Sequence, residues 1–122
     1  MDSYSKTIEN LGRQLKLSQS EIHALSRLIT ELKTSWPQAK FRLFGSKVKG
    51  IADEESDLDL LIELPCKITK DIRKRIIHKI FDLNLTFDTN ISALIMSEHE
   101  WEKPPYSLLP IYAYIQEEGV SI

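Results

Sequence analysis

Two aspartates and a glycine-serine pair have the types and the spacing that suit phosphate chemistry. Gly45-Ser46 is followed, after ten residues, by Asp57-Leu58-Asp59. The apolar run around Leu58 predicts a strand, on which Asp57 and Asp59 would point to the same face. Two carboxylates about 6–7 Å apart along one strand face repel each other unless a cation lies between them. The pair therefore predicts a hard divalent cation, for which Mg²⁺ is the best match.

The Gly45-Ser46 pair predicts a turn that binds phosphate. Gly45 has no Cβ, so a phosphate can approach its backbone, and Ser46 would begin a short helix whose free amides and hydroxyl favour an anion. Lys47 and Lys49 add positive charge, although a solvated turn explains these two lysines about as well as phosphate binding does. Together with the carboxylates, the turn predicts a nucleoside triphosphate that is attacked at its α-phosphate and releases pyrophosphate.

The elements that must position these residues are helices and strands in an α+β order. Apolar periodicity, capping boxes and proline breaks predict one small mixed sheet flanked by helices. In chain order we expect a helix from the capping box Ser18–Glu21 to Trp36-Pro37, strands at Lys40–Phe44 and Leu58–Glu63, a helix opening at Thr69, a strand at Asn90–Met96, a short helix from Ser97 and a last helix at Ser107–Glu118.

The sequence also predicts which side chains in these elements and in the loop between the first two strands are buried or exposed. We expect the helix that opens at Thr69 to bury its apolar residues on one face and Glu63 to lie at the edge of the site or in solvent. Asp53, Glu54 and Glu55 are expected to form an exposed acidic loop. The apolar set of the helix is Ile72, Ile76, Ile77, Ile80 and Phe81, with Leu83 as a further candidate.

Length and composition predict one soluble domain in a reducing cytoplasm. Residues 1–17 are weakly patterned: the spacing of Ile8, Leu11, Leu15 and Leu17 is compatible with a short helix, which Gly12 disfavours, and the segment is interpreted as an N-terminal extension before a single domain at 18–122. A net charge of −2 argues against a general nucleic-acid binder. One cysteine, Cys66, excludes an internal disulfide, and no apolar run approaches the roughly 18 residues of a membrane span.

The glycine-serine pair and the aspartate pair, with their apolar flanks, resemble the DNA polymerase β-type nucleotidyltransferase superfamily. The segments Lys47-Val48-Lys49-Gly50 and 56–62 are similar to those of the minimal nucleotidyltransferase (MNT) group of small bacterial and archaeal proteins. That group often carries arginines where Lys47 and Lys49 stand. The resemblance covers residues 20–97 in the order of elements and is specific across residues 43–62.

The resemblance implies a nucleotidyltransferase fold and a metal-dependent transfer of a nucleoside monophosphate, with AMP from ATP as the expected case. It implies that Asp57 and Asp59 hold Mg²⁺ and are catalytic, and that the segment from Gly45 to Lys49 binds the nucleotide. Many MNT proteins are encoded beside a HEPN-domain protein and act as the antitoxin of that pair, some by adenylylating the toxin. A HEPN-domain partner is therefore implied, in a homo- or hetero-oligomer.

One position departs from the pattern of the superfamily. Active relatives usually carry a third carboxylate on the strand after the long helix, and the corresponding residue here is Ser92. Asp88 shares the strand parity of Ser92 and, if the strand began early, would point to the same face about 13 Å farther along it, which makes Asp88 the alternative candidate for the third position. Two functions stay open: an active transferase, or a catalytically weak binding module of the same fold that neutralises its partner by occlusion. A third, weaker alternative is a fragment or subunit of a larger transferase assembly.

Overall fold

A four-stranded mixed sheet is the centre of the fold, which this computed structural model describes over residues 3–50 and 56–122. The predicted acidic loop at Asp53, Glu54 and Glu55 lies outside the described residues. The strand order is β3-β2-β1-β4. The strands are β1 (Lys40–Phe44), β2 (Leu58–Leu64), β3 (Ile91–Ser97) and β4 (Val120–Ser121). The predicted α+β class with a small mixed sheet is therefore confirmed.

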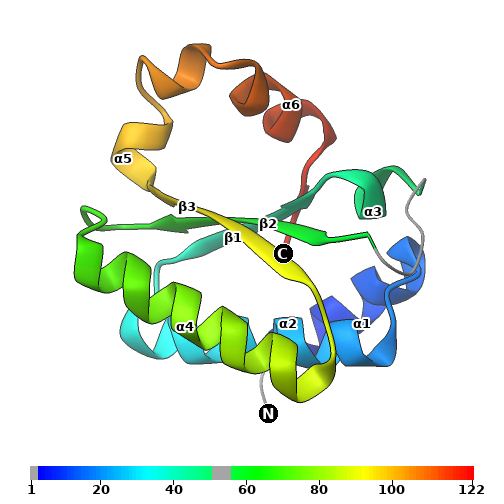
Figure 1. The fold of residues 1–122 in the computed structure, drawn as a ribbon. Coiled ribbons are helices and arrows are strands. Elements are labelled where there is room, and N and C mark those ends of the chain that lie inside the picture. The colour runs from blue at the N-terminus through cyan, green and yellow to red at the C-terminus, as the bar shows by residue number, and fades with distance from the viewer. Residues whose placement is uncertain (1–2, 51–55) are drawn as a thin grey trace.

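Helices cover the two faces of this sheet unequally (Figure 1). Three long helices lie on one face, and a short helical cap from the C-terminal segment lies on the other. The long helices are α1 (Ser3–Leu15), α2 (Gln19–Ser35) and α4 (Lys70–Phe87), and the cap consists of α5 (Glu98–Trp101), η1 (Tyr106–Leu108) and α6 (Pro110–Glu118). A one-turn helix, α3 (Ser46–Lys49), follows β1. No helix in the described part of the chain is long and apolar enough to cross a membrane.

Strand register determines which side chains share a face of the sheet. β2 runs antiparallel to β1, with Asp59 opposite Phe44, and parallel to β3, with Asp59 opposite Ser92. Because side chains alternate along a strand, Leu58 and Leu60 point to the other face, under the three long helices. That face is the main core, and its β2 residues are completely buried.

The N-terminal segment forms a helix, α1, although its sequence pattern is weak. Ile8 is completely buried in the main core. Gly12 allows this packing, because a Cβ there would lie 2.5 Å from Cδ1 of Ile22 in α2. The glycine that argues against a helix is therefore the residue that lets α1 approach α2. The domain boundary at residue 17 stays a prediction.

The two longest helices begin where their sequence signals predict. Ser18 and Glu21 form the expected capping box at the start of α2, and the Thr69 hydroxyl accepts a hydrogen bond from the Ile72 amide at the start of α4. The predicted single apolar face of α4 is wrong, because Ile77 and Phe81 are 49% and 61% exposed. Each lies about 100° around the helix from the preceding isoleucine, which is buried.

The predicted last helix at Ser107–Glu118 is wrong in its extent, because it is two elements. Leu109 separates η1 from α6 with an extended backbone (φ −78°, ψ 145°). The residue before a proline avoids the helical region, so Pro110 begins a helix of its own. Beyond α6 the chain adds the short strand β4 to the edge of β1, a strand that the sequence did not predict.

Two side chains of α4 reach the outer edge of β3. Asn84 accepts a hydrogen bond from the Ile91 amide at 2.9 Å and donates one to the Ile91 carbonyl at 3.1 Å. Arg73 donates to the Ile95 carbonyl at 3.4 Å. These bonds fix α4 relative to the strand that it precedes.

Candidate functional site

Asp57 and Asp59 lie at the start of β2, on the sheet face that the long helices leave uncovered. Asp59 lies in β2 between Phe44 on β1 and Ser92 on β3, and it is half-buried. Asp57 lies one residue before the strand and is exposed. Strand alternation directs the Asp59 carboxylate to this face, and Asp57 lies close enough for its charge to act on Asp59.

The electrostatics of this pair suit a bound cation. Burial raises the pKa of the Asp59 carboxyl above its usual range, and the negative charge of Asp57 raises it further. A cation beside the two groups would stabilise both charged forms. Carboxylate oxygens are the ligands that Mg²⁺ prefers, so the donor set fits this ion. Within residues 3–50 and 56–122, no group of three or more His, Cys, Asp or Glu side chains gathers as a metal site.

Gly45 brings the predicted phosphate turn directly against Asp59. Its backbone has φ 85° and ψ −162°, a region that is essentially restricted to glycine. A Cβ at this position would also overlap the Asp59 carboxylate. The turn and the carboxylate therefore pack in contact, which only a residue without a side chain permits.

The remaining residues of the predicted nucleotide segment have different surroundings. Ser46 is the first residue of α3. Lys47 is buried, with its Nζ 3.3 Å from Oε2 of Glu21, so a solvated turn does not describe it. Lys49 is exposed and its Nζ lies 4.7 Å from the centre of the Tyr114 ring. A role for either lysine in phosphate binding stays a prediction.

The position of the third carboxylate is occupied by a hydroxyl. Ser92 is exposed and lies directly opposite Asp59 in the register of β2 and β3. Asp88 lies outside β3, which begins at Ile91, and its left-handed backbone (φ 54°) ends α4. An early start of the strand, on which the alternative role of Asp88 depended, is not observed. The sheet therefore brings Ser92, and not Asp88, beside the aspartate pair.

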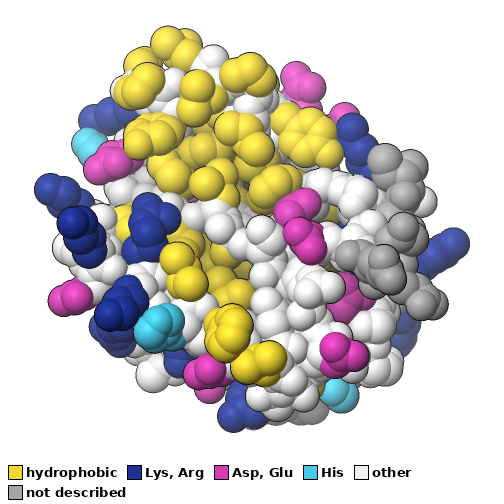
Figure 2. Space-filling view, in the orientation of Figure 1, with side chains coloured by type: hydrophobic (Ala, Val, Ile, Leu, Met, Phe, Trp, Pro, Cys, Tyr) yellow, Lys and Arg dark blue, Asp and Glu magenta, His cyan; other side chains and the backbone are white. Residues whose placement is uncertain are grey.

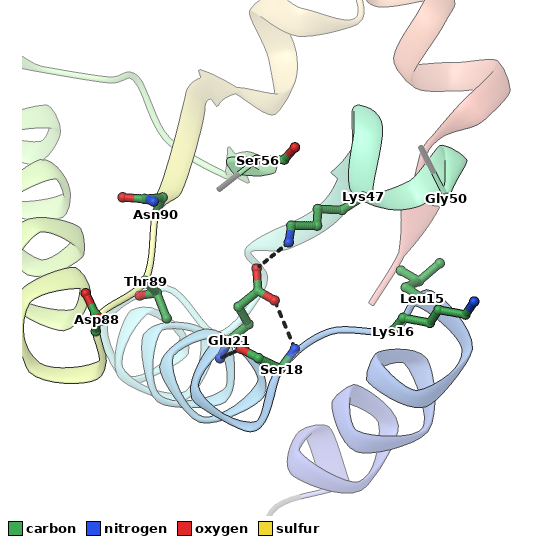
Figure 3. A pocket seen from close by; sticks show the side chains of 10 residues that line it. All are labelled: Leu15, Lys16, Ser18, Glu21, Lys47, Gly50, Ser56, Asp88, Thr89 and Asn90. Carbon is green, nitrogen blue, oxygen red and sulfur yellow. Dashed lines mark hydrogen bonds and ion pairs between the residues drawn. The ribbon is translucent and has the colours of Figure 1, made fainter. Parts of the chain in front are cut away.

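A cavity of about 500 Å³ lies between α3, the start of α2 and the segment that follows α4 (Figure 3). Lys47 reaches across it toward Glu21 at the start of α2, and Asp88 lies on its wall. Asp57 and Asp59 are not among its lining residues. Sequence reasoning identified Glu21 by its capping box but missed its ion pair with Lys47, because residues 26 positions apart show no local pattern.

A second group of charges lies farther along the same sheet face as Asp59. Glu63 is buried, so the expectation of a solvent position is wrong, whereas the alternative of a position at the edge of the site stays a prediction. Burial raises the pKa of its carboxyl, and the charges of Glu102 and Glu98 raise it further. Lys40 pairs with Glu98 at 2.5 Å, which partly balances this group. Glu63 is covered because α5 closes over this end of β2.

Comparison with known proteins identifies the family. No curated protein and no solved structure gives a significant match to the chain. The family model of the nucleotidyltransferase domain matches residues 25–107, which is more than half of the chain and includes the turn, both aspartates and Ser92. With the mixed sheet and the aspartates at its open face, this match shows that the chain belongs to the nucleotidyltransferase domain family.

Proposed function

We propose that this nucleotidyltransferase uses Mg²⁺ to transfer AMP from ATP to a partner protein, as the antitoxin of a HEPN/MNT pair. The observation that carries the proposal is the contact between the Gly45 turn and Asp59, because it brings the predicted phosphate turn beside the predicted metal ligands. The resemblance of residues 43–62 to the MNT group supports the antitoxin role.

The proposed reaction is an in-line displacement at the α-phosphorus. An acceptor hydroxyl loses its proton and forms the new P–O bond, and the bond to the β-phosphate breaks, so pyrophosphate leaves with that electron pair. Mg²⁺, held by Asp57 and Asp59, would neutralise charge on the phosphate oxygens. The turn at Gly45 and Ser46 would orient the triphosphate along this face of the sheet.

Exposed apolar side chains support a protein as the acceptor. On the C-terminal cap, Leu108 is 76% exposed, and Leu109 and Ile111 are each 42% exposed. On α4, Leu85 is 69% exposed and Phe81, one turn before it, is 61% exposed. Apolar side chains gather over the cap in the face shown in Figure 2. Apolar side chains that are exposed together, as on the cap, are typical of a protein interaction site.

Transfer of label from ATP tests the proposal. Wild-type protein, Mg²⁺, ATP labelled at the α-phosphate and the HEPN-domain partner should yield labelled partner, and a chelator should abolish the label. The double variant Asp57→Ala with Asp59→Ala should yield none, whereas the control Asp71→Ala with Asp82→Ala, exposed aspartates on α4, should label fully. Absence of label with wild type, or equal labelling by the site variant, contradicts the proposal.

The second candidate function is a binding module that neutralises its partner by occlusion. The hydroxyl of Ser92 opposite Asp59 favours it, because serine is a weak metal ligand and a poor base at the position where a carboxylate is expected. In that case the variant without Asp57 and Asp59 carboxylates still binds the partner and still suppresses its toxicity. Loss of suppression by this folded variant would eliminate the binding module and leave the transferase.

A further inference from the structure

Lys47 follows Ser46 directly, but its side chain turns toward α2 and not into solvent. The residue is 8% exposed, and its Nζ lies 3.3 Å from Oε2 of Glu21, which is 9% exposed. Figure 3 shows the lysine side chain spanning the gap between α3 and the first turn of α2. A buried charge pair of this kind is costly to break, because the remaining partner is left uncompensated.

Glu21 is a rigid anchor for this lysine. Its other carboxylate oxygen, Oε1, accepts a hydrogen bond from the Ser18 amide at 2.9 Å, and the Ser18 hydroxyl accepts one from the Glu21 amide at 3.0 Å. The capping box therefore fixes the carboxylate at the start of α2, whose residues Leu25 and Leu28 are completely buried in the main core.

Helix α3 has little means of holding its own conformation. It has four residues, glycines on both sides and no side-chain hydrogen bond at its N-cap, Gly45. A single helical turn is unfavourable in isolation, so tertiary contacts must fix it. Val48 packs against the main core, and the ion pair of Lys47 supplies a polar attachment to a different helix.

We propose that the Glu21–Lys47 ion pair is a positioning device that holds the Gly45-Ser46 turn in register with Asp59. Lys47 then serves the nucleotide site through Glu21 and not by touching the triphosphate. This inference rests on the proposed nucleotide site. It differs from a direct phosphate contact in one respect: Glu21 is required for nucleotide binding although it is not itself a ligand.

A double-mutant cycle separates positioning from direct contact. Glu21→Gln keeps an oxygen for the capping box and removes only the charge, and Lys47→Met removes the ammonium but keeps the chain length. We expect each single variant to weaken binding of ATP with Mg²⁺ by about 10-fold, the lower end for residues that orient a ligand-binding group. The double variant should bind no more weakly than either single one, because both changes break the same contact.

Direct contact predicts a different pattern. Glu21→Gln would then release the ammonium and leave ATP binding unchanged or tighter, while Lys47→Met alone would weaken it, and this pattern overturns the proposal. If a single variant does not fold, the double variant is the substitute, because it leaves no buried charge without a partner. Glu31→Gln is the control, since it breaks the partly exposed pairs with Arg27 and Lys79, far from the turn.

Hydrogen exchange keeps the positioning role testable without nucleotide. Backbone amides of residues 43–50 should exchange faster in Glu21→Gln, Lys47→Met and the double variant, and at the wild-type rate in Glu31→Gln. Unchanged exchange in the folded double variant overturns the proposal even if wild type binds ATP. Failure of wild type to bind any of the four nucleoside triphosphates rejects the proposed function, and the exchange result then decides the role of the ion pair alone.

Discussion

The two faces of strand β2 differ in chemistry although they are built from alternate residues of one short segment. Leu58, Leu60 and Ile62 on one face are completely buried under α1, α2 and α4. On the opposite face, Asp59 and Glu63 lie on either side of Leu61 in the sequence. One strand therefore supplies apolar contacts to the core and carboxylates to the site.

The difference between the faces shows where the stability of the domain resides. The helix-covered face joins one extended apolar cluster with residues from α1, α2, α4 and the strands. The opposite face has a small cluster in which Leu61 and Met96 of the sheet pack against Trp101 and Ile115 of the cap. Carboxylates with raised pKa values occupy this second face, so it carries an electrostatic cost that the first face offsets.

Truncation of one leucine on each face tests this comparison most strongly. Leu60→Ala should lower the free energy of unfolding by about 2–5 kcal/mol, the usual range for a leucine lost from a packed core. Leu61→Ala should lie toward the lower end of that range, because its small cluster can relax around the gap. Urea unfolding followed by circular dichroism measures both values. A larger loss of stability for Leu61→Ala than for Leu60→Ala would contradict the assignment of the main core to the helix-covered face.

A methyl group at Gly45 tests the contact between the turn and the site. Gly45→Ala should cost about 1–3 kcal/mol of stability, because its backbone conformation suits only glycine, and should displace the Asp59 carboxylate. ATP binding should therefore be lost, as measured by calorimetry in the presence of Mg²⁺.

Gly50→Ala is the matched control for this change. Gly50 also has a positive φ of 73°, but among the residues that the structure describes no atom lies within 4 Å of a Cβ built there. It should lose stability and keep ATP binding. If both variants bind ATP equally, close packing of Gly45 against Asp59 has no part in nucleotide binding.

A carboxylate introduced at position 92 of β3 tests whether this position and Asp59 can share a bound cation. Ser92→Asp places a like charge opposite Asp59 and should lower stability by about 1 kcal/mol in the absence of metal. Added Mg²⁺ should restore the loss and raise the rate of nucleotidyl transfer. Thermal unfolding with and without MgCl₂ measures the first effect, with Ser92→Asn as the uncharged control. A stability loss that Mg²⁺ does not reverse would show that the two positions do not share an ion.

Neutralisation of Glu63 should give the smallest effect and a defined pH dependence. Its pKa in the folded protein is raised above the ordinary 4.5, by burial and by Glu102 and Glu98, against the opposing charges of Lys40 and Arg42. The folded state therefore holds the proton more tightly than the unfolded state. The resulting stability is complete below pH 4.5 and is lost as the pH rises through the raised pKa.

Glu63→Gln should therefore stabilise the protein at pH 7 by about 0.5 kcal/mol. This gain over wild type should shrink as the pH falls toward 4.5. Thermal unfolding between pH 4.5 and 8 measures it, with the exposed Glu117→Gln as control. A constant difference across that range would show that Glu63 does not titrate there.

Local signals in the sequence predicted much of this architecture. β1 spans Lys40–Phe44 as expected, because its residues favour β-structure and Gly45 ends it. The capping box at Ser18 marks the start of α2. The spacing of Gly45 from the aspartates predicted a shared site, and the structure places Gly45 against Asp59. These features depend on neighbouring residues or on strand parity, which the sequence expresses directly.

The unpredicted features depend on contacts between distant segments. Gly12 argues against a helix by propensity, yet the docking of α1 on Ile22 requires it. Lys47 was expected in solvent or on phosphate, and its partner Glu21 is supplied by another helix. The apolar residues of α4 outnumber the positions that the sheet can cover, so composition could not show that Phe81 is exposed. Tertiary packing decides which of these residues are buried, paired or exposed, and it overrides local conformational preference.

The hydrogen bonds from α4 to the outer edge of β3 also hinder the pairing of a strand from another chain with this edge. An edge strand normally offers free amides and carbonyls on which a strand of another chain can form. Here Asn84 occupies both backbone groups of Ile91, and Arg73 occupies the carbonyl of Ile95. An incoming strand would have to displace these side chains before it could pair. The domain can thus expose apolar surface to a partner while the β3 edge of its sheet resists edge-to-edge aggregation.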